Sequence, residues 1–245
     1  MVQGKSFTIY PPRPMTILPA NFAGFLLFLG VLAFSLAACD VFGTSSGDGV
    51  PTTLEMRVGT ALLSHTDAAA HGGALVTLDE VKLLLRTIKF SRVEDDVELD
   101  FRSEMIAVTL GLTGSPTSVA VADLPPGAYE RIDFVIHKPG DTEPIPDPEF
   151  REGPSGDQRY SVIIRGTVDG EPFELKIRES IQQRLELQSP LVIEEGSGAI
   201  KVTLLADVGT WFVSEDGRLL DPRLEADADE IADRIDDSFS ALDSD

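Results

Sequence analysis

Apolar and polar residues alternate along most of the chain from Thr52 onward, and this period of two restricts the fold more than any other feature. The pattern first appears in residues 54–58, and it returns in residues 118–139, 160–177, 181–187 and 199–206. Successive side chains of a β-strand point to opposite faces, so each stretch predicts a strand with one buried face. No helical segment of the length that joins parallel strands lies between the stretches. The sequence therefore favours an antiparallel β-sandwich or open barrel, and we expect a mainly β fold, an antiparallel β-sandwich.

Two local patterns predict how the strands turn and bend. Asp169-Gly170 lies between two alternating stretches, which is a strong signal for a tight hairpin. In residues 79–93 the apolar side chains recur at odd positions up to Leu85 and at even positions from Ile88 onward. Either a strand buried on both faces or a β-bulge near Arg86-Thr87 explains this change.

The period changes near the C-terminus, where apolar residues recur every three or four positions and most of the others are acidic. The apolar residues are Leu224, Ala228, Ile231, Ile235, Phe239 and Leu242. This spacing places them on one stripe of a helix. We expect residues 221–245 to form an acidic amphipathic helix that packs across the sandwich, with docking onto a partner as the alternative.

The first 38 residues have the layout of a secretory signal. Lys5 and Arg13 precede an uncharged run over residues 22–38. The run leads into Leu36-Ala37-Ala38-Cys39, which resembles the lipobox of bacterial lipoproteins and holds the only cysteine of the chain. The resemblance implies that the Cys39 thiol receives a diacylglyceryl group, that the preceding peptide is removed, and that the new N-terminus receives a fatty acyl group such as palmitate. The alternatives are a secretory signal without lipid and an uncleaved transmembrane helix, for which the run is at the lower limit of length.

These segments predict four parts: a lipoprotein signal peptide over residues 1–38, a flexible tether over 39–51, a β-sandwich domain over 52–220 and the helix over 221–245. The tether is rich in glycine, serine and aspartate, a composition typical of flexible linkers. It contains Gly-Thr-Ser-Ser-Gly, which has the letters of a hydrolase nucleophile elbow. No strand precedes this match, so we interpret it as chance.

A family resemblance rests on residues 78–90, LDEVKLLLRTIKF, and residues 123–139, DLPPGAYERIDFVIHKP. Together with the lipobox, these motifs are similar to those of a group of uncharacterised bacterial lipoproteins with a β-rich domain of unknown function. The resemblance covers most of the chain after Cys39. It implies the fold and a place in the cell envelope, and it brings no catalytic residues.

Composition restricts the partners. The chain has 41 acidic and 20 basic residues and a formal net charge of −21, so its surface repels nucleic acid. With one cysteine, which the lipobox assigns to lipid, disulfides are excluded and folding depends on the apolar core.

Two places hold candidate site residues. The proline-rich loop over residues 139–157 carries Asp141, Glu143, Asp147 and Glu149, whose oxygens could gather around calcium, although the spacing is not that of an EF-hand. His137, at the end of a predicted strand, is a candidate metal ligand or general base, or simply a polar residue at a strand end. His65 and His71 lack the spacing of a zinc pair.

The sequence thus predicts an exported envelope protein that is attached to a membrane by lipid, with inner or outer membrane left open. We expect a non-enzymatic binding or structural module whose protein or glycan partner is unknown, with no bound cofactor and no role in nucleic-acid binding. One alternative is an envelope hydrolase with a site near His137 and the acidic loop. Another is a calcium-dependent adhesion module that uses the same loop.

Overall fold

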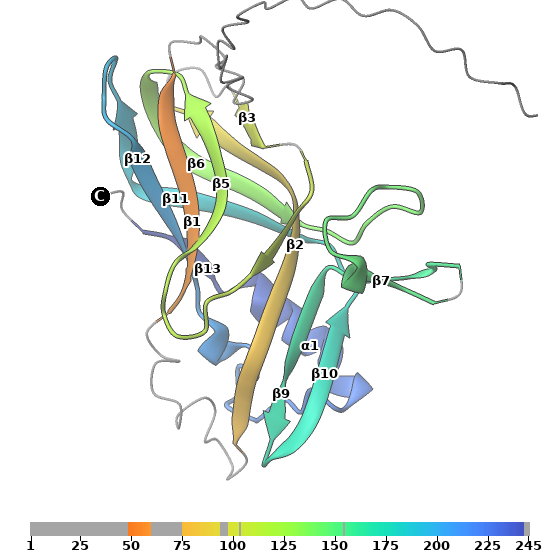
Figure 1. Cartoon of the computed structure of the whole chain (residues 1–245). Coiled ribbons are helices and arrows are strands. Elements are labelled where there is room, and N and C mark those ends of the chain that lie inside the picture. Colours follow the sequence, from red (N-terminus) through yellow and green to blue (C-terminus); the bar gives the residue numbers. More distant parts are fainter. Residues whose placement is uncertain (1–48, 60–74, 94–97, 103, 154, 243–245) are drawn as a thin grey trace, which may run out of the picture. The chain divides into compact units, whose positions relative to one another are not determined.

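Two β-sheets pack against each other in the computed structural model of the chain (Figure 1), which describes residues 49–59, 75–93, 98–102, 104–153 and 155–242. The first sheet has the order β13-β12-β1-β5. Its strands are β1 (Val50–Val58), β5 (Thr117–Leu124), β12 (Ile200–Ala206) and β13 (Phe239–Ala241). Inward side chains of both sheets, such as Leu54, Leu204, Phe90 and Ile132, form one apolar core. The predicted mainly β fold, a sandwich of largely antiparallel sheets with a single C-terminal helix, is confirmed.

The second sheet is built on the long strand β2 (Val76–Arg92) and has the order β10-β9-β2-β6-β11. Its other strands on this path are β6 (Gly127–Ile136), β9 (Val162–Val168), β10 (Glu171–Ile177) and β11 (Ile181–Ile193). Two further strands, β3 (Glu98–Arg102) and β4 (Ile106–Thr109), also pair with β2. A small separate ribbon joins β7 (Arg151–Glu152) to β8 (Gln158–Arg159).

Strand β2 changes partner at Leu84. Its first half pairs with β9 and its second half with β6. The Leu84 N–H donates to the Ser161 carbonyl at 2.9 Å, and the Leu84 carbonyl accepts from the His137 N–H at 2.8 Å. The register between β2 and β6 shifts between Leu85 and Ile88, which confirms the predicted bulge near Arg86-Thr87. The Leu84 side chain points away from the main core and is buried in a separate cluster, so β2 is covered on both faces at this point.

The predicted hairpin at Asp169-Gly170 is confirmed. It joins β9 to β10, and both turn residues have positive φ angles of 53° and 83°, as a tight hairpin of this type requires. The turn at Pro125-Pro126 instead carries the chain from the first sheet to the second. The Tyr129 hydroxyl fixes this corner by donating to the Pro125 carbonyl at 2.7 Å, and Arg92 donates to the Pro126 carbonyl at 2.8 Å.

One pairing in the first sheet is parallel. Strand β12 runs alongside β1 with Thr52 opposite Ile200 and Val58 opposite Ala206. The reason is the connection that precedes it. β12 enters the first sheet from β11 of the second, at the same end at which β1 begins, so the two strands run in one direction.

The C-terminal helix is shorter than predicted. α1 spans Glu225–Asp236, and the chain then continues as β13, which pairs with β12. Ile231 and Ile235 are buried as the helical stripe predicts, but Leu224 is 53% exposed and Phe239 is buried as part of a strand. The expected helix to residue 245 was wrong because β12 offers an edge whose backbone groups the chain can pair with.

Short 3₁₀ turns and aromatic residues complete the core. The turns are η2 (Pro148–Phe150) and η3 (Val208–Thr210). Trp211 follows η3 and is fully buried, and its indole N–H donates to the Ser238 hydroxyl at 2.7 Å. Trp211 therefore connects the segment after β12 to the segment between α1 and β13.

Candidate functional site

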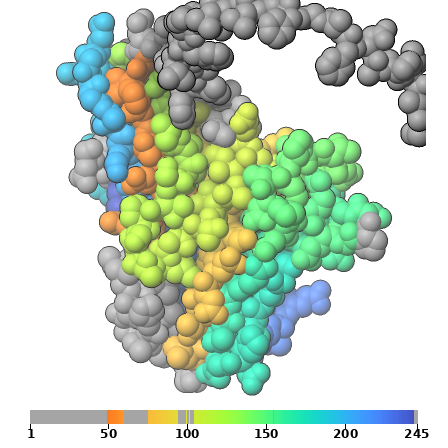
Figure 2. All heavy atoms as spheres, viewed as in Figure 1, coloured from red at the N-terminus to blue at the C-terminus, as the bar shows by residue number. Residues whose placement is uncertain are grey.

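The acid-rich loop of residues 139–157 folds back onto the outer face of the second sheet. Phe150 is its apolar anchor, because it is fully buried in a small cluster with Leu84, Tyr160 and Ile163. Figure 2 shows the green loop beside β10, in teal, and next to β2, in orange and yellow. The loop therefore belongs to the packed structure of the domain.

Lysine and arginine side chains of the sheet hold two of the predicted calcium ligands. Lys82 Nζ lies 2.9 Å from Asp147 and 3.0 Å from Glu149, and Arg165 lies 2.9 Å from Glu149. Burial alone would lower the pKa of Lys82, but its hydrogen bonds to the two carboxylates outweigh this and hold the pKa above its usual value. The same contacts keep the pKa of Glu149 below its usual value. Both carboxylates are charged and already paired at neutral pH.

The other two predicted ligands have different partners. Glu143 accepts from the Gly140 N–H at 2.9 Å and lies 3.5 Å from Arg86, whereas Asp141 pairs with Arg159. The described residues contain no group of three or more histidine, cysteine, aspartate or glutamate side chains that could hold a metal ion. The structure thus pairs all four acids with lysine or arginine, with Asp147 and Glu149 sharing Lys82, and calcium binding stays a prediction.

Sequence reasoning missed the cations that hold the loop. Lys82, Arg165 and Lys176 come from β2, β9 and β10, and Lys176 lies 2.5 Å from Glu152. Each occupies a polar position between buried residues of a strand. A lysine or arginine between buried strand residues, in a chain that also has an acid-rich loop, was the sequence signal that could have predicted these ion pairs.

His137 lies just beyond β6 and contacts a serine. Its Nδ1 is 2.7 Å from the Ser180 hydroxyl, and the two residues are 43 positions apart in the chain. Burial lowers the pKa of His137, and the nearby Arg86 and Lys138 lower it further against the opposing effect of Glu143. The imidazole is therefore neutral at pH 7 and can exchange a hydrogen bond with the hydroxyl.

The lipobox residues Leu36, Ala37, Ala38 and Cys39 lie outside the described residues, as do His65 and His71. The structure therefore gives no geometry for the predicted lipid attachment. Within the described part of the chain, no helix has both the length and the apolar character to cross a bilayer.

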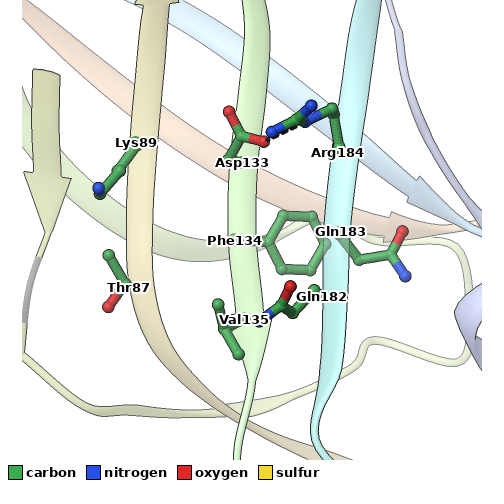
Figure 3. Close-up of a pocket in the computed structure, with 8 residues that line it drawn as sticks. All are labelled: Thr87, Lys89, Asp133, Phe134, Val135, Gln182, Gln183 and Arg184. Atoms are coloured by element: carbon green, nitrogen blue, oxygen red, sulfur yellow. Dashed lines mark hydrogen bonds and ion pairs between the residues drawn. The ribbon is translucent and has the colours of Figure 1, made fainter. Parts of the chain in front are cut away.

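The outer face of the second sheet also has an open hollow of about 320 Å³ over β2, β6 and β11. Figure 3 shows its lining, with Thr87 and Lys89 from β2, Asp133 and Val135 from β6, and Gln182 and Arg184 from β11. Except for Thr87, which lies at the bulge of β2, these residues are paired with a residue of a neighbouring strand.

Asp133 organises the polar groups of this hollow. Its carboxylate accepts from Arg131 Nε at 2.9 Å and from Arg184 Nε at 3.1 Å. Arg131 also donates to the Ser91 hydroxyl at 2.8 Å. The Arg184 side chain remains 67% exposed, so its other N–H groups face solvent. The hollow thus presents preoriented donors and acceptors that suit a polar ligand.

Comparisons with known proteins add one similarity. No family model matches the sequence, and no curated protein matches it. Among solved structures, MbnP from Methylosinus trichosporium is similar with a TM-score of 0.41 and 11% sequence identity, over 66% of this chain and 76% of that chain. A similarity of this size gives no information on ligand or activity.

Proposed function

We propose that the chain is a lipid-anchored protein of the bacterial cell envelope, one of the uncharacterised lipoproteins that it resembles, and that its sandwich serves as a non-enzymatic binding or structural module. The observation that carries the proposal is Leu36-Ala37-Ala38-Cys39 at the end of an uncharged run, with Cys39 the only cysteine. Two or more acyl chains on one residue provide stable membrane attachment, whereas a single chain does not.

The position of the first strand supports an anchor close to the domain. β1 begins at Val50, eleven residues after Cys39. Even a fully extended chain of this length reaches at most about 40 Å. A lipid on Cys39 would therefore hold the sandwich near the membrane surface.

The hollow over β2, β6 and β11 supports a binding role. Its polar groups stand on paired strands and are oriented by Asp133, so a ligand would meet them with little loss of side-chain freedom. Arg184 and Gln182 can donate to the carbonyl, hydroxyl or carboxylate oxygens of a glycan or a polypeptide. We infer that a polar envelope component binds on this face.

Metabolic labelling tests the anchor. Cells that express the full chain are grown with an alkyne analogue of palmitate, and the protein is then purified and coupled to a fluorophore. We expect label on the unchanged chain and none on Cys39→Ser, which keeps the apolar run but lacks the thiol. The Cys39→Ser protein should also be washed from the membrane fraction more easily than the unchanged chain. Equal labelling of both chains would overturn the proposal.

The contact between His137 and Ser180 favours the hydrolase as a second candidate. A neutral imidazole 2.7 Å from a hydroxyl is the pairing that activates serine nucleophiles. The hydrolase would require turnover of an ester such as p-nitrophenyl acetate that disappears in Ser180→Ala. The binding module requires no turnover, so this assay separates the two functions.

A further inference from the structure

A second, smaller hollow lies beside the C-terminal end of the acid-rich loop. It has a volume of about 220 Å³ and is lined by Lys138, Asp157, Arg159 and Arg178. Lys138 follows β6, Arg159 belongs to β8, and Arg178 follows β10. Three cations therefore reach one small space from three segments of the chain.

Two of these cations lack an acidic partner. In the part of the chain that the structure describes, no carboxylate lies within ion-pair distance of Lys138 or of the Arg178 guanidinium. Arg159 pairs with Asp141, whose side chain is 83% exposed, and donates to the Pro139 carbonyl at 3.2 Å. The cations under the same loop, such as Lys82 and Arg165, are all neutralised by close carboxylates.

Neighbouring groups hold the cations in place. The Arg178 guanidinium lies 5.6 Å from the centre of the Tyr160 ring, and its backbone N–H donates to Glu179 at 3.1 Å. Stacking on an aromatic ring restricts a guanidinium and leaves its N–H groups free to donate. Burial, and then Arg86 and Lys138, lower the pKa of the neighbouring His137 against the opposing effect of Glu143.

Asp157 is the one acid in the lining, and it decides which anion fits. A carboxylate repels a fully deprotonated oxyanion such as sulfate. Inorganic phosphate keeps at least one proton near neutral pH, and Asp157 can accept a hydrogen bond from that O–H group. A phosphate monoester, whose second pKa is about 6, keeps its proton only at mildly acidic pH. Donors that arrive from three directions also suit a tetrahedral group better than a planar carboxylate.

We propose that Lys138, Arg159 and Arg178 form a binding site for a phosphate group, with Asp157 selecting a protonated phosphate over sulfate. The site lies apart from the hollow over β2, β6 and β11, and the inference does not rest on the lipid anchor or on the proposed function.

Calorimetric titration of the full chain, purified in detergent, tests this site. Inorganic phosphate is added in Tris buffer at constant ionic strength, with sulfate as the competing anion. We expect saturable binding of phosphate, and binding of sulfate that is weaker by about tenfold. Arg178→Ala and Lys138→Ala should each weaken phosphate binding by about tenfold, since each removes one charge-assisted hydrogen bond. Lys201→Ala removes a lysine that is 65% exposed on β12 and should change nothing.

Two further arms complete the test. Asp157→Asn should reduce the preference for phosphate over sulfate, and equal binding of the two anions by the unchanged chain would overturn the role of Asp157. Tighter binding of glycerol 3-phosphate than of inorganic phosphate would identify a phosphorylated molecule as the ligand, and the reverse would identify free phosphate. Absence of saturable phosphate binding by the unchanged chain would overturn the site. Unchanged melting temperatures of the variants would show that any loss of binding in them does not come from unfolding.

Discussion

At the scale of single residues, Asp236 stands at the unfavourable end of α1. Burial raises the pKa of Asp236, and the negative charges of Asp237 and Asp233 raise it further. The hydrogen bond from Gln183 offsets these effects only in part. A carboxyl whose pKa is higher in the folded chain stabilises the fold below its unfolded pKa and loses that contribution as pH rises through the folded pKa. At neutral pH the charge therefore destabilises the helix, whose C-terminal dipole also repels it.

Asp236→Asn should raise the melting temperature at pH 7. The asparagine oxygen can still accept from Gln183 Nε2, which lies 2.6 Å from the present carboxylate. We expect a gain of about 0.5 kcal/mol in the free energy of unfolding, from the removal of like-charge contacts and of the charge at the helix end. Thermal unfolding at pH 7 and at pH 3 measures it, and the gain should disappear at pH 3.

Asp216 provides a control of opposite sign. The Ser214 hydroxyl and then the Arg218 N–H lower the pKa of Asp216, so its charge contributes stability above the unfolded pKa. Asp216→Asn should lower the melting temperature at pH 7. A gain in both variants would show that the loss of negative charge, and not the local contacts, sets the outcome.

At the scale of elements, Phe150 connects the acid-rich loop to the sheet. Replacement of a fully buried phenylalanine by alanine costs about 3 kcal/mol or more. Because the Phe150 cluster is separate from the main core, we expect the loss in Phe150→Ala to release the loop while the sandwich stays folded. Limited proteolysis should cut residues 139–157 of this variant much faster than those of the unchanged chain.

Leu224→Ala is the matched control for this change. It removes an apolar side chain of similar hydrophobicity that is 53% exposed, so the rate of loop cleavage should not change. If Phe150→Ala were cut no faster than Leu224→Ala, the ion pairs at Lys82, Arg165 and Lys176 would be sufficient to hold the loop.

The same elements show how far the sequence predicts this fold. The bulge after Leu85 and the Asp169-Gly170 hairpin follow from neighbouring residues, because parity and turn chemistry are local. The end of α1 does not, because Phe239 fits a helical stripe and a strand equally well and only the edge of β12 decides. The pairing of Lys82 with Asp147 joins residues 65 positions apart, so no local pattern can indicate it.

At the scale of the whole molecule, the net charge of −21 makes the chain attract cations in general. Screening by a divalent ion weakens the repulsion among the acids, and this effect does not depend on the identity of the ion. The candidate ligands Asp141, Glu143, Asp147 and Glu149 are already paired with arginine or lysine. A calcium ion would have to replace these contacts and would gain little over them.

We therefore expect calcium and magnesium to raise the melting temperature of the full chain equally. The measurement is thermal unfolding in calcium chloride, magnesium chloride and sodium chloride at matched ionic strength, followed by addition of EGTA. A rise that is specific to calcium and reversed by EGTA would contradict this expectation. Glu149→Gln would then decide where the ion binds. If the loop holds the ion, the variant loses the calcium-specific rise, because Glu149 contributes one of the oxygens nearest to the Lys82 ammonium.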